Sequence, residues 1–459
     1  MPMIPPQDAA FLMVESREHP MHVGALQVFD LPSRAKRDYV SRLYEQSLQF
    51  TELRSLMRQR PRTPVSSLGQ LWWEIDKDVD LEYHVRLSAL PAPGRVRELF
   101  SLVSRLHGSL LDRHHPLWEC HLIDGLEGRR FAVYTKIHHS MVDGVAGMRL
   151  ITGALSEDPK AIIAPFWAVP DSAAEPAPDA GDGTNLVERL LGSVLGAAES
   201  VRTVAEGTVD LAKLLTEVLR GQRDAVTLPA PKTMWNGSIT GARRFAAQSW
   251  EMDRLKSAAA ASGGTLNDVV LAMCAGALRR YLQVADALPE RSLISLVPVS
   301  LALRGAKSGG GNAVGAVLCS LGTDIEDPQQ RMAAIRASMQ TAKDILAAMT
   351  PAQVQASGSL LLAAPLAIGA VPGLLGTTSP LFNVTISNVP GPRNELFWNG
   401  ARMANVYPVS IPYEGQGLNF TVTSSAGMMH FGITGCRRSV PRLQRLIDYL
   451  EDSLAELEA

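Results

Sequence analysis

The sequence is poor in cysteine, with four among 459 residues, and no two of them form a CxxC pair. A disulfide framework is therefore not expected, and the thiols are expected to be buried and free, as in a reducing compartment such as the cytoplasm. They are Cys120, Cys274, Cys319 and Cys436. The net charge is also small, at -2 near pH 7. The chain therefore has no overall attraction for nucleic acid, although local charged patches are compatible with this balance.

Motifs of several enzyme classes are also missing. The chain contains no GxSxG elbow, no GxxxxGK[ST] loop and no GxGxxG after a strand. The sequence therefore gives no support for a function as a serine hydrolase, a nucleoside triphosphatase or a dinucleotide-dependent oxidoreductase. Residues 309–312 are glycine-rich but lack the lysine of a phosphate-binding loop, so we interpret them as a flexible loop.

A long uninterrupted apolar segment is missing too. Residues 1–10 show no basic flank followed by an apolar run, so neither a signal peptide nor an N-terminal anchor is expected. Residues 360–375 are apolar but interrupted by Pro365, Gly369 and Pro372. At about 1.5 Å per residue they fall short of a hydrocarbon core about 30 Å thick. We expect this run to be buried, to line a tunnel, or to form a hydrophobic surface that dips into lipid.

The composition predicts a globular α/β protein with two domains. Hydrophobic residues make up 46% and charged residues 20% of a chain longer than one ordinary core requires. Residues 165–184 are rich in Pro, Ala, Asp and Gly, and residues 185–220 predict an amphipathic, interrupted helix. We therefore predict a first lobe at 1–164, a linker with this helix at 165–235, and a second lobe at 236–459.

Both lobes are expected to mix strands and helices, because stretches with period-two alternation interleave with stretches at helical spacing. In the first lobe we expect strands at 23–29, 71–75, 81–86, 118–123 and 131–137, and helices at 36–49, 95–110 and 145–155. In the second lobe we expect strands at 292–299, 315–322, 382–388, 418–424 and 430–436, and helices at 267–281, capped by Thr265, 328–349 and 440–457.

The most informative stretch is residues 134–147, where His138 and His139 follow a strand and Asp143-Gly144 precedes a helix. Adjacent strand side chains point to opposite faces, so we expect one histidine to line a cavity and the other to be structural. A neutral imidazole can take a proton from a hydroxyl near pH 7 and return it to a leaving group. A second pair, at 114–115, lacks the Asp-Gly turn.

The neighbouring residues have simpler interpretations. We expect Asp143 to shape the loop or to pair with a cation, and Gly144 to permit a backbone conformation or approach that a Cβ would obstruct. A metal site at His138, His139 and Asp143 is disfavoured, because strand geometry separates the histidines and no HExxH pair or cysteine cluster completes a ligand shell.

The pattern HHxxxDG resembles that of CoA-dependent acyltransferases and peptide-synthetase condensation domains. Other stretches narrow the resemblance to the bacterial wax ester synthase/diacylglycerol acyltransferase family, and it extends from about residue 5 to the C-terminus. They are residues 20–24, 116–118, 243–249, 267–272, 387–392 and 398–400. The resemblance implies two mixed-sheet lobes related to chloramphenicol acetyltransferase, with the active site at their interface.

The resemblance also implies the chemistry. His139 would remove the proton from a fatty alcohol or diacylglycerol hydroxyl, which attacks the acyl-CoA thioester, with His138 and Asp143 as further catalytic residues. Acyl-CoA would be a substrate, and no cofactor or metal is implied. Substrate-binding positions would be Gly144, Asn267, Ser387 and Asn388, with Asn267 or N–H groups near Gly144 as oxyanion donors.

Several alternatives stay open. Asn267-Asp268 is also typical of a helix N-terminus, and residues 387–392 of a rigid turn. Whether Arg304 pairs with Asp143 is unresolved, because family members commonly have arginine nearer the serine of this stretch. The competing function is a catalytically weak lipid-binding or lipid-droplet surface protein of the same fold. In either case we expect a cytoplasmic protein attached peripherally to the inner face of the membrane and to lipid inclusions.

Overall fold

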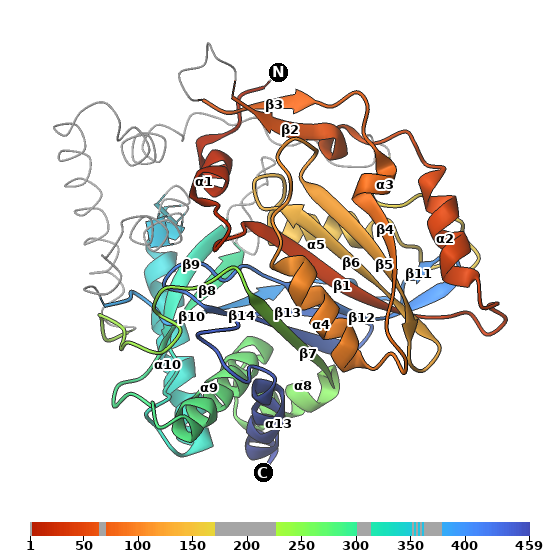
Figure 1. Cartoon of the computed structure of the whole chain (residues 1–459). Helices are drawn as coiled ribbons and strands as arrows, with labels where there is room; N and C mark the ends of the chain where they lie inside the picture. The colour runs from red at the N-terminus through yellow and green to blue at the C-terminus, as the bar shows by residue number, and fades with distance from the viewer. Residues whose placement is uncertain are drawn as a thin grey trace.

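The structure is a computed structural model of the chain. It describes residues 2–63, 70–169, 226–300, 314–350 and 379–459, together with 353, 354, 357, 358, 360 and 361. Two six-stranded sheets lie side by side and are covered by helices (Figure 1). The predicted helix at 185–220, the glycine-rich loop and most of the apolar run lie outside the described residues.

The first sheet has the order β11-β12-β1-β6-β5-β4. All its neighbours are antiparallel except β4 and β5, which are parallel. Its strands are β1 (His22–Asp30), β4 (Val85–Ala89), β5 (Trp118–Leu126), β6 (Arg130–His138), β11 (Phe397–Trp398) and β12 (Ala401–Val409). The accompanying elements are α1 (Pro6–Val14), α2 (Tyr39–Leu48), the 3-10 turn η1 (Ser55–Arg58), the hairpin β2 (Gln59–Arg62) and β3 (Trp72–Ile75), α3 (Leu81–His84), α4 (Val96–His107) and α5 (Gly144–Thr152).

The second sheet has the order β7-β14-β13-β10-β8-β9 and is also mixed, since β10 runs parallel to both of its neighbours. Its strands are β7 (Arg243–Glu251), β8 (Ile294–Ser300), β9 (Val314–Ser320), β10 (Val384–Val389), β13 (Leu418–Ser425) and β14 (Met428–Cys436). Its helices are α8 (Met252–Ala261), α9 (Leu266–Val284), α10 (Pro328–Ala347) and α13 (Arg445–Glu458). Thr265 caps α9 through a reciprocal capping box with Asp268, as the sequence predicts for its start.

The second half of the chain contributes a strand to the first sheet. β12 comes from the second half of the chain but pairs along β1 of the first sheet, from Gly24 opposite Val409 to Asp30 opposite Arg402. The lobes also meet closely at Gly432, where a Cβ would lie 1.9 Å from the Pro408 carbonyl oxygen, so this contact requires glycine. The division predicted at 236–459 did not include this contribution, which ties the two sheets into one body.

Most predicted elements are present, with boundaries shifted by a few residues. The strand predicted at 81–86 is wrong for its first half, because Asp80 accepts hydrogen bonds from the Glu82 and Tyr83 amides and starts the short helix α3. The four cysteines are buried and free, as predicted. Among the described residues, no single helix has the length and hydropathy to cross a membrane; α8 and α9 pass that test only together and are bent by 94°.

Candidate active site

The two motif histidines lie where β6 ends, and their backbones are held from opposite sides. The His138 amide donates to the Leu117 carbonyl at 2.9 Å, next to β5, and the His139 amide donates to the Met21 carbonyl at 2.9 Å, next to β1. His138 is fully buried, whereas His139 keeps part of its surface exposed. This arrangement agrees with the expectation that the two side chains have different roles.

His138 has a hydrogen-bond partner at one ring nitrogen and a carboxylate close to the other. Its Nδ1 lies 2.7 Å from the Ser140 hydroxyl, and its Nε2 lies 3.3 Å from Glu15 Oε1. Glu15 in turn pairs with Arg113 at 2.9 Å and accepts from the Met21 amide at 3.1 Å. Burial raises the pKa of the Glu15 carboxyl, but these partners outweigh burial, and the net pKa is lowered. Glu15 is therefore a carboxylate that lies against His138, and His139 is the candidate for the general base.

The His139 ring is stacked on Phe11. The ring centroids are 4.3 Å apart and the planes are 16° from parallel. Burial lowers the pKa of His139, and its contact with its own backbone and the charge of Asp143 offset this lowering only in part. His139 is therefore neutral at pH 7, which is the state that a general base requires.

Asp143 acts as the N-cap of α5, where its carboxylate accepts from the Ala146 amide at 2.8 Å. Of its two expected roles, shaping the loop is thus present in the structure, while Arg304 lies outside the described residues. A second carboxyl is close by: burial, and then the charge of Asp143, raise the pKa of Asp8 to about 6.

The interpretation of Gly144 as a position that a Cβ would obstruct is wrong. A Cβ there would meet only Val389 Cγ2 at 3.7 Å, an ordinary contact, and its φ is not positive. The contact is informative for another reason. Val389 ends β10 of the second sheet and packs with Val142 and Met148 of the first lobe, so the motif helix lies at the lobe interface.

Strand alternation separates the two residues predicted from β10. Ser387 points to the same side as Val389, toward the first lobe, and is half-buried. Asn388 points to the other side and is exposed. The structure therefore brings Ser387, rather than Asn388, to the face that carries the motif.

Asn267 lies in the first turn of α9, directly before the capping-box residue Asp268. The hydrogen bonds and ring contacts of the described residues do not join Asn267 to His139. The helix-start interpretation is thus confirmed for Asp268. Within the described part of the chain, no group of three or more His, Cys, Asp or Glu side chains is arranged to hold a metal ion.

Sequence reasoning missed helix α1. Asp8, Phe11 and Glu15 follow each other at helical spacing, and each is coupled to one member of the motif. Asp8 feels the charge of Asp143, Phe11 stacks on His139, and Glu15 contacts His138. The spacing of an acid, an aromatic residue and an acid along one face was the available signal. Its meaning depended on contacts with residues more than 120 positions away.

The fold has two lobes, and the motif helix that follows the histidines lies at their interface. The fold matches the first condensation domain of the calcium-dependent antibiotic synthetase, with a TM-score of 0.59 at 16% identity over 100% of this chain and 95% of that chain. At this identity the likeness concerns the fold alone.

The chain belongs to the wax ester synthase/diacylglycerol acyltransferase family. The model of the family's catalytic domain matches residues 4–270 and that of its C-terminal domain matches residues 310–458. The wax ester synthase/diacylglycerol acyltransferase of Marinobacter aquaeolei VT8 is 41% identical, with a TM-score of 0.77 over 100% of this chain and 99% of that chain. A Mycobacterium tuberculosis protein, provisionally named a diacylglycerol O-acyltransferase, is 50% identical over 99% of this chain and 98% of its own length.

The stack on Phe11 predicts a pH effect. In Phe11→Leu, water reaches the imidazole, so the pKa of His139 rises toward 6.5. Activity needs the neutral ring, so the acidic limb of the kcat/KM profile should move to higher pH. A ring with a pKa near 6.5 is still mostly neutral at pH 7, so the loss at pH 7 should be less than about twofold and should grow as the pH falls below 6.5.

Phe100→Leu is the matched control, since Phe100 packs edge-on against Phe245 at 5.4 Å, away from the histidines. In this control variant the acidic limb of the kcat/KM profile should stay at the wild-type pH, even if the variant is less stable to heat. An unshifted limb in a folded Phe11→Leu protein would show that the stack does not set the state of the base.

Proposed function

We propose that this protein transfers a long-chain acyl group from acyl-CoA to the hydroxyl of a fatty alcohol or of diacylglycerol, forming a wax ester or triacylglycerol. The observation that carries the proposal is the neutral His139 imidazole, held by Phe11 at the interface of two lobes. Family membership supports the same chemistry. A buried, neutral and oriented base is what a catalytically weak lipid-binding protein would not need.

The reaction needs one base and no covalent enzyme intermediate. His139 accepts the proton of the acceptor hydroxyl while the oxygen forms a bond to the thioester carbonyl carbon. The resulting tetrahedral oxyanion collapses, the C–S bond breaks, and the imidazolium returns the proton to the CoA sulfur. Donor and acceptor must be present together, so positioning by both lobes contributes several kcal/mol.

The oxyanion requires hydrogen-bond donors. The first N–H groups of α5 have no partner within the helix, and the helix N-terminus favours negative charge. The Asp143 carboxylate accepts a hydrogen bond from the Ala146 amide at 2.8 Å and so holds the first turn of α5 in place. We assign the oxyanion role to the amides at Gly144 and Val145. Asn267 is the weaker candidate, because its place in the first turn of α9 also serves the helix start.

His139→Ala should lower thiol release from palmitoyl-CoA with hexadecanol by about 10²- to 10⁴-fold, the typical contribution of a general base. The protein should keep its circular dichroism spectrum, because His139 is only partly buried and Phe11, its ring partner, also lies outside the hydrophobic core. His138→Ala should instead lower the melting temperature, since it leaves a cavity at a fully buried position and removes one of the partners of Glu15.

His114→Ala is the matched control for this experiment. Its side chain is 92% exposed, and its ion-pair partner among the described residues is nearby Asp112, so turnover should be unchanged. A folded His139→Ala protein with wild-type thiol release would contradict the mechanism.

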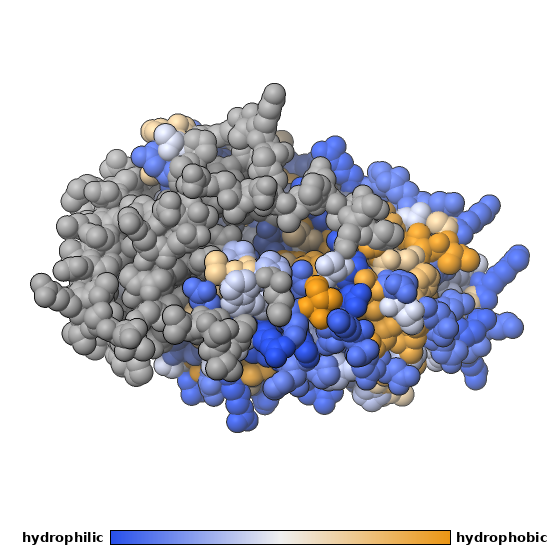
Figure 2. All heavy atoms as spheres, turned by 90° about the horizontal axis from the view of Figure 1, so that it is seen from above, coloured by the Kyte–Doolittle hydropathy of each residue, from blue (hydrophilic) through white to orange (hydrophobic). Residues whose placement is uncertain are grey.

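We further propose that the protein attaches peripherally to membranes and lipid inclusions from the cytoplasm, because its acceptors reside there. Three exposed apolar residues support this: Met3 (47% exposed), Met13 (47%) and Leu110 (41%). Each directly neighbours a member of one small cluster, Ile4, Leu12 or Leu111, that anchors α1. The face seen in Figure 2, at the end of the molecule with β2 and β3, shows apolar atoms grouped among charged ones.

Flotation with neutral phosphatidylcholine vesicles tests the attachment. Wild-type protein should float at low and high salt alike, because apolar contact is not screened. The double variant Met13→Asp/Leu110→Asp should stay at the bottom of the gradient. Val284→Asp removes another exposed apolar residue, at the end of α9, and should float normally. Binding only to anionic vesicles at low salt would contradict apolar attachment.

A further inference from the structure

A groove runs along the junction of the two lobes, between α4 and β7. It consists of two adjoining hollows of about 740 and 570 Å³ that share Ser104, Arg105, Arg243 and Arg437. The lobes are joined there by a hydrogen bond of 2.9 Å from the Phe245 amide to the Ser104 hydroxyl. In size each hollow falls within the usual range of small-molecule sites, about 300 to 1,000 Å³.

The groove is strongly basic, although the whole chain carries a net charge of -2. Two carboxylates line it, Glu18 and Glu98, and Glu98 lies 3.2 Å from Arg95. The arginines among its lining residues are Arg17, Arg97, Arg105, Arg243, Arg244 and Arg437. Such a concentration of one sign of charge attracts anions to the junction.

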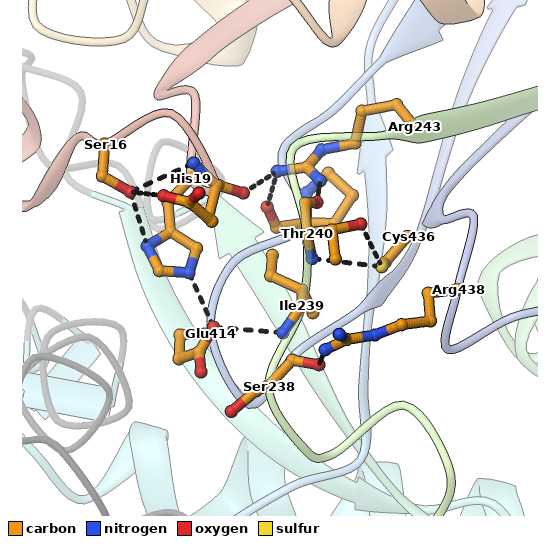
Figure 3. A network of polar contacts seen from close by, with 11 residues as sticks. Ser16, His19, Ser238, Ile239, Thr240, Arg243, Glu414, Cys436 and Arg438 are labelled. Carbon is orange, nitrogen blue, oxygen red and sulfur yellow. Dashed lines mark hydrogen bonds and ion pairs between the residues drawn. The ribbon is translucent and has the colours of Figure 1, made fainter.

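Arg243 is the buried centre of this groove, with 4% of its surface exposed. Its guanidinium donates to the carbonyl oxygens of Thr240, Glu18 (2.8 Å) and Pro412 (3.3 Å), and the first two contacts are drawn in Figure 3. In the described part of the chain these partners are carbonyls and not carboxylates. Burial lowers the pKa of Arg243 to about 10, which still leaves it charged at pH 7. A buried cation whose hydrogen-bond partners among the described residues are carbonyl oxygens favours an anion in the adjoining groove.

The groove and the active site share one short segment of chain. Glu15 contacts His138, Arg17 and Glu18 line the groove, and the Met21 carbonyl accepts from the His139 amide. Three residues lie between Arg17 and Met21, so their Cα atoms are at most about 15 Å apart. A ligand could therefore have one end in the groove and the other at His139.

We infer that this arginine-lined groove binds the phosphate groups of the 3′,5′-ADP end of acyl-CoA, with Arg243 as its fixed buried cation. The inference rests on the proposed function. In acyl-CoA the pantetheine arm separates the phosphates from the thioester, so their site must lie at a distance from the base. Guanidinium groups suit phosphate because they donate two parallel hydrogen bonds to it.

The test compares two acyl donors, palmitoyl-CoA and palmitoyl-N-acetylcysteamine, of which the second keeps the thioester but lacks the phosphates together with most of the pantetheine arm. Arg105→Gln and Arg437→Gln remove exposed arginines, so both variants should fold. Each should raise the KM for palmitoyl-CoA about tenfold, the loss of one charge-assisted phosphate contact. The KM for palmitoyl-N-acetylcysteamine and for hexadecanol should not change. Adenosine 3′,5′-bisphosphate should compete with palmitoyl-CoA in the wild type and much less in the variants.

Arg438→Gln is the matched control. This arginine follows Arg437 directly, but its side chain donates to the Ser238 carbonyl at 2.8 Å, as Figure 3 shows. An equal rise of the KM in this control would overturn the assignment in favour of a general charge effect. Equal losses with both donors, or an unchanged KM for palmitoyl-CoA, would also overturn it.

The same phosphate chemistry could come from an anionic lipid headgroup. Variants that lose binding to phosphatidylglycerol vesicles but keep the KM for palmitoyl-CoA would assign the groove to lipid and overturn the inference. Failure of the proposed function can be distinguished from failure of the groove assignment, because the wild-type protein would then turn over neither acyl donor.

Discussion

The contact between Phe11 and His139 is the interaction on which the site depends. A histidine at the end of a strand is ordinarily free to rotate and to hydrate, and it then titrates near 6.5. Here α1 covers the ring with an aromatic face and places Glu15 against the neighbouring His138. One helix therefore keeps one imidazole neutral and fixes the other, so that a pair of identical residues has two functions.

The second constraint is the joining of the lobes. β12 completes the first sheet, while Val389, at the end of β10, enters the core of the first lobe beside α5. The base thus lies where both halves of the chain meet, as direct transfer between two bound substrates requires. The surfaces around it differ in character. In the proposed function, the exposed apolar residues near α1 would suit the lipid acceptor, and the arginine-lined groove between α4 and β7 would suit the phosphates of the donor. Each substrate would then approach His139 from the surface that matches its chemistry.

The features that were predictable from the sequence are local. The strand before His138, the helix after Asp143 and the cap at Thr265 each depend on residues within one or two turns. The features that were not predictable depend on pairing across long stretches of chain. Nothing in the local pattern of β12 assigns it to β1, and nothing near Phe11 places it on a ring 128 positions later. Gly144 shows the opposite error, because a motif glycine was given a steric reason that its neighbours do not supply.

The most direct test of this account is the titration of His139 itself. Carbon-13 NMR of protein labelled at histidine Cε1, with the resonance assigned through a His139→Gln variant, would follow the ring in the free enzyme. The account predicts that His139 titrates below 6.5 and is neutral at pH 7, because burial outweighs the charge of Asp143. A midpoint above 6.5 would contradict the predicted shift, and a midpoint above about 7 would mean that the ring is mostly protonated at pH 7, which would contradict the assignment of His139 as the base.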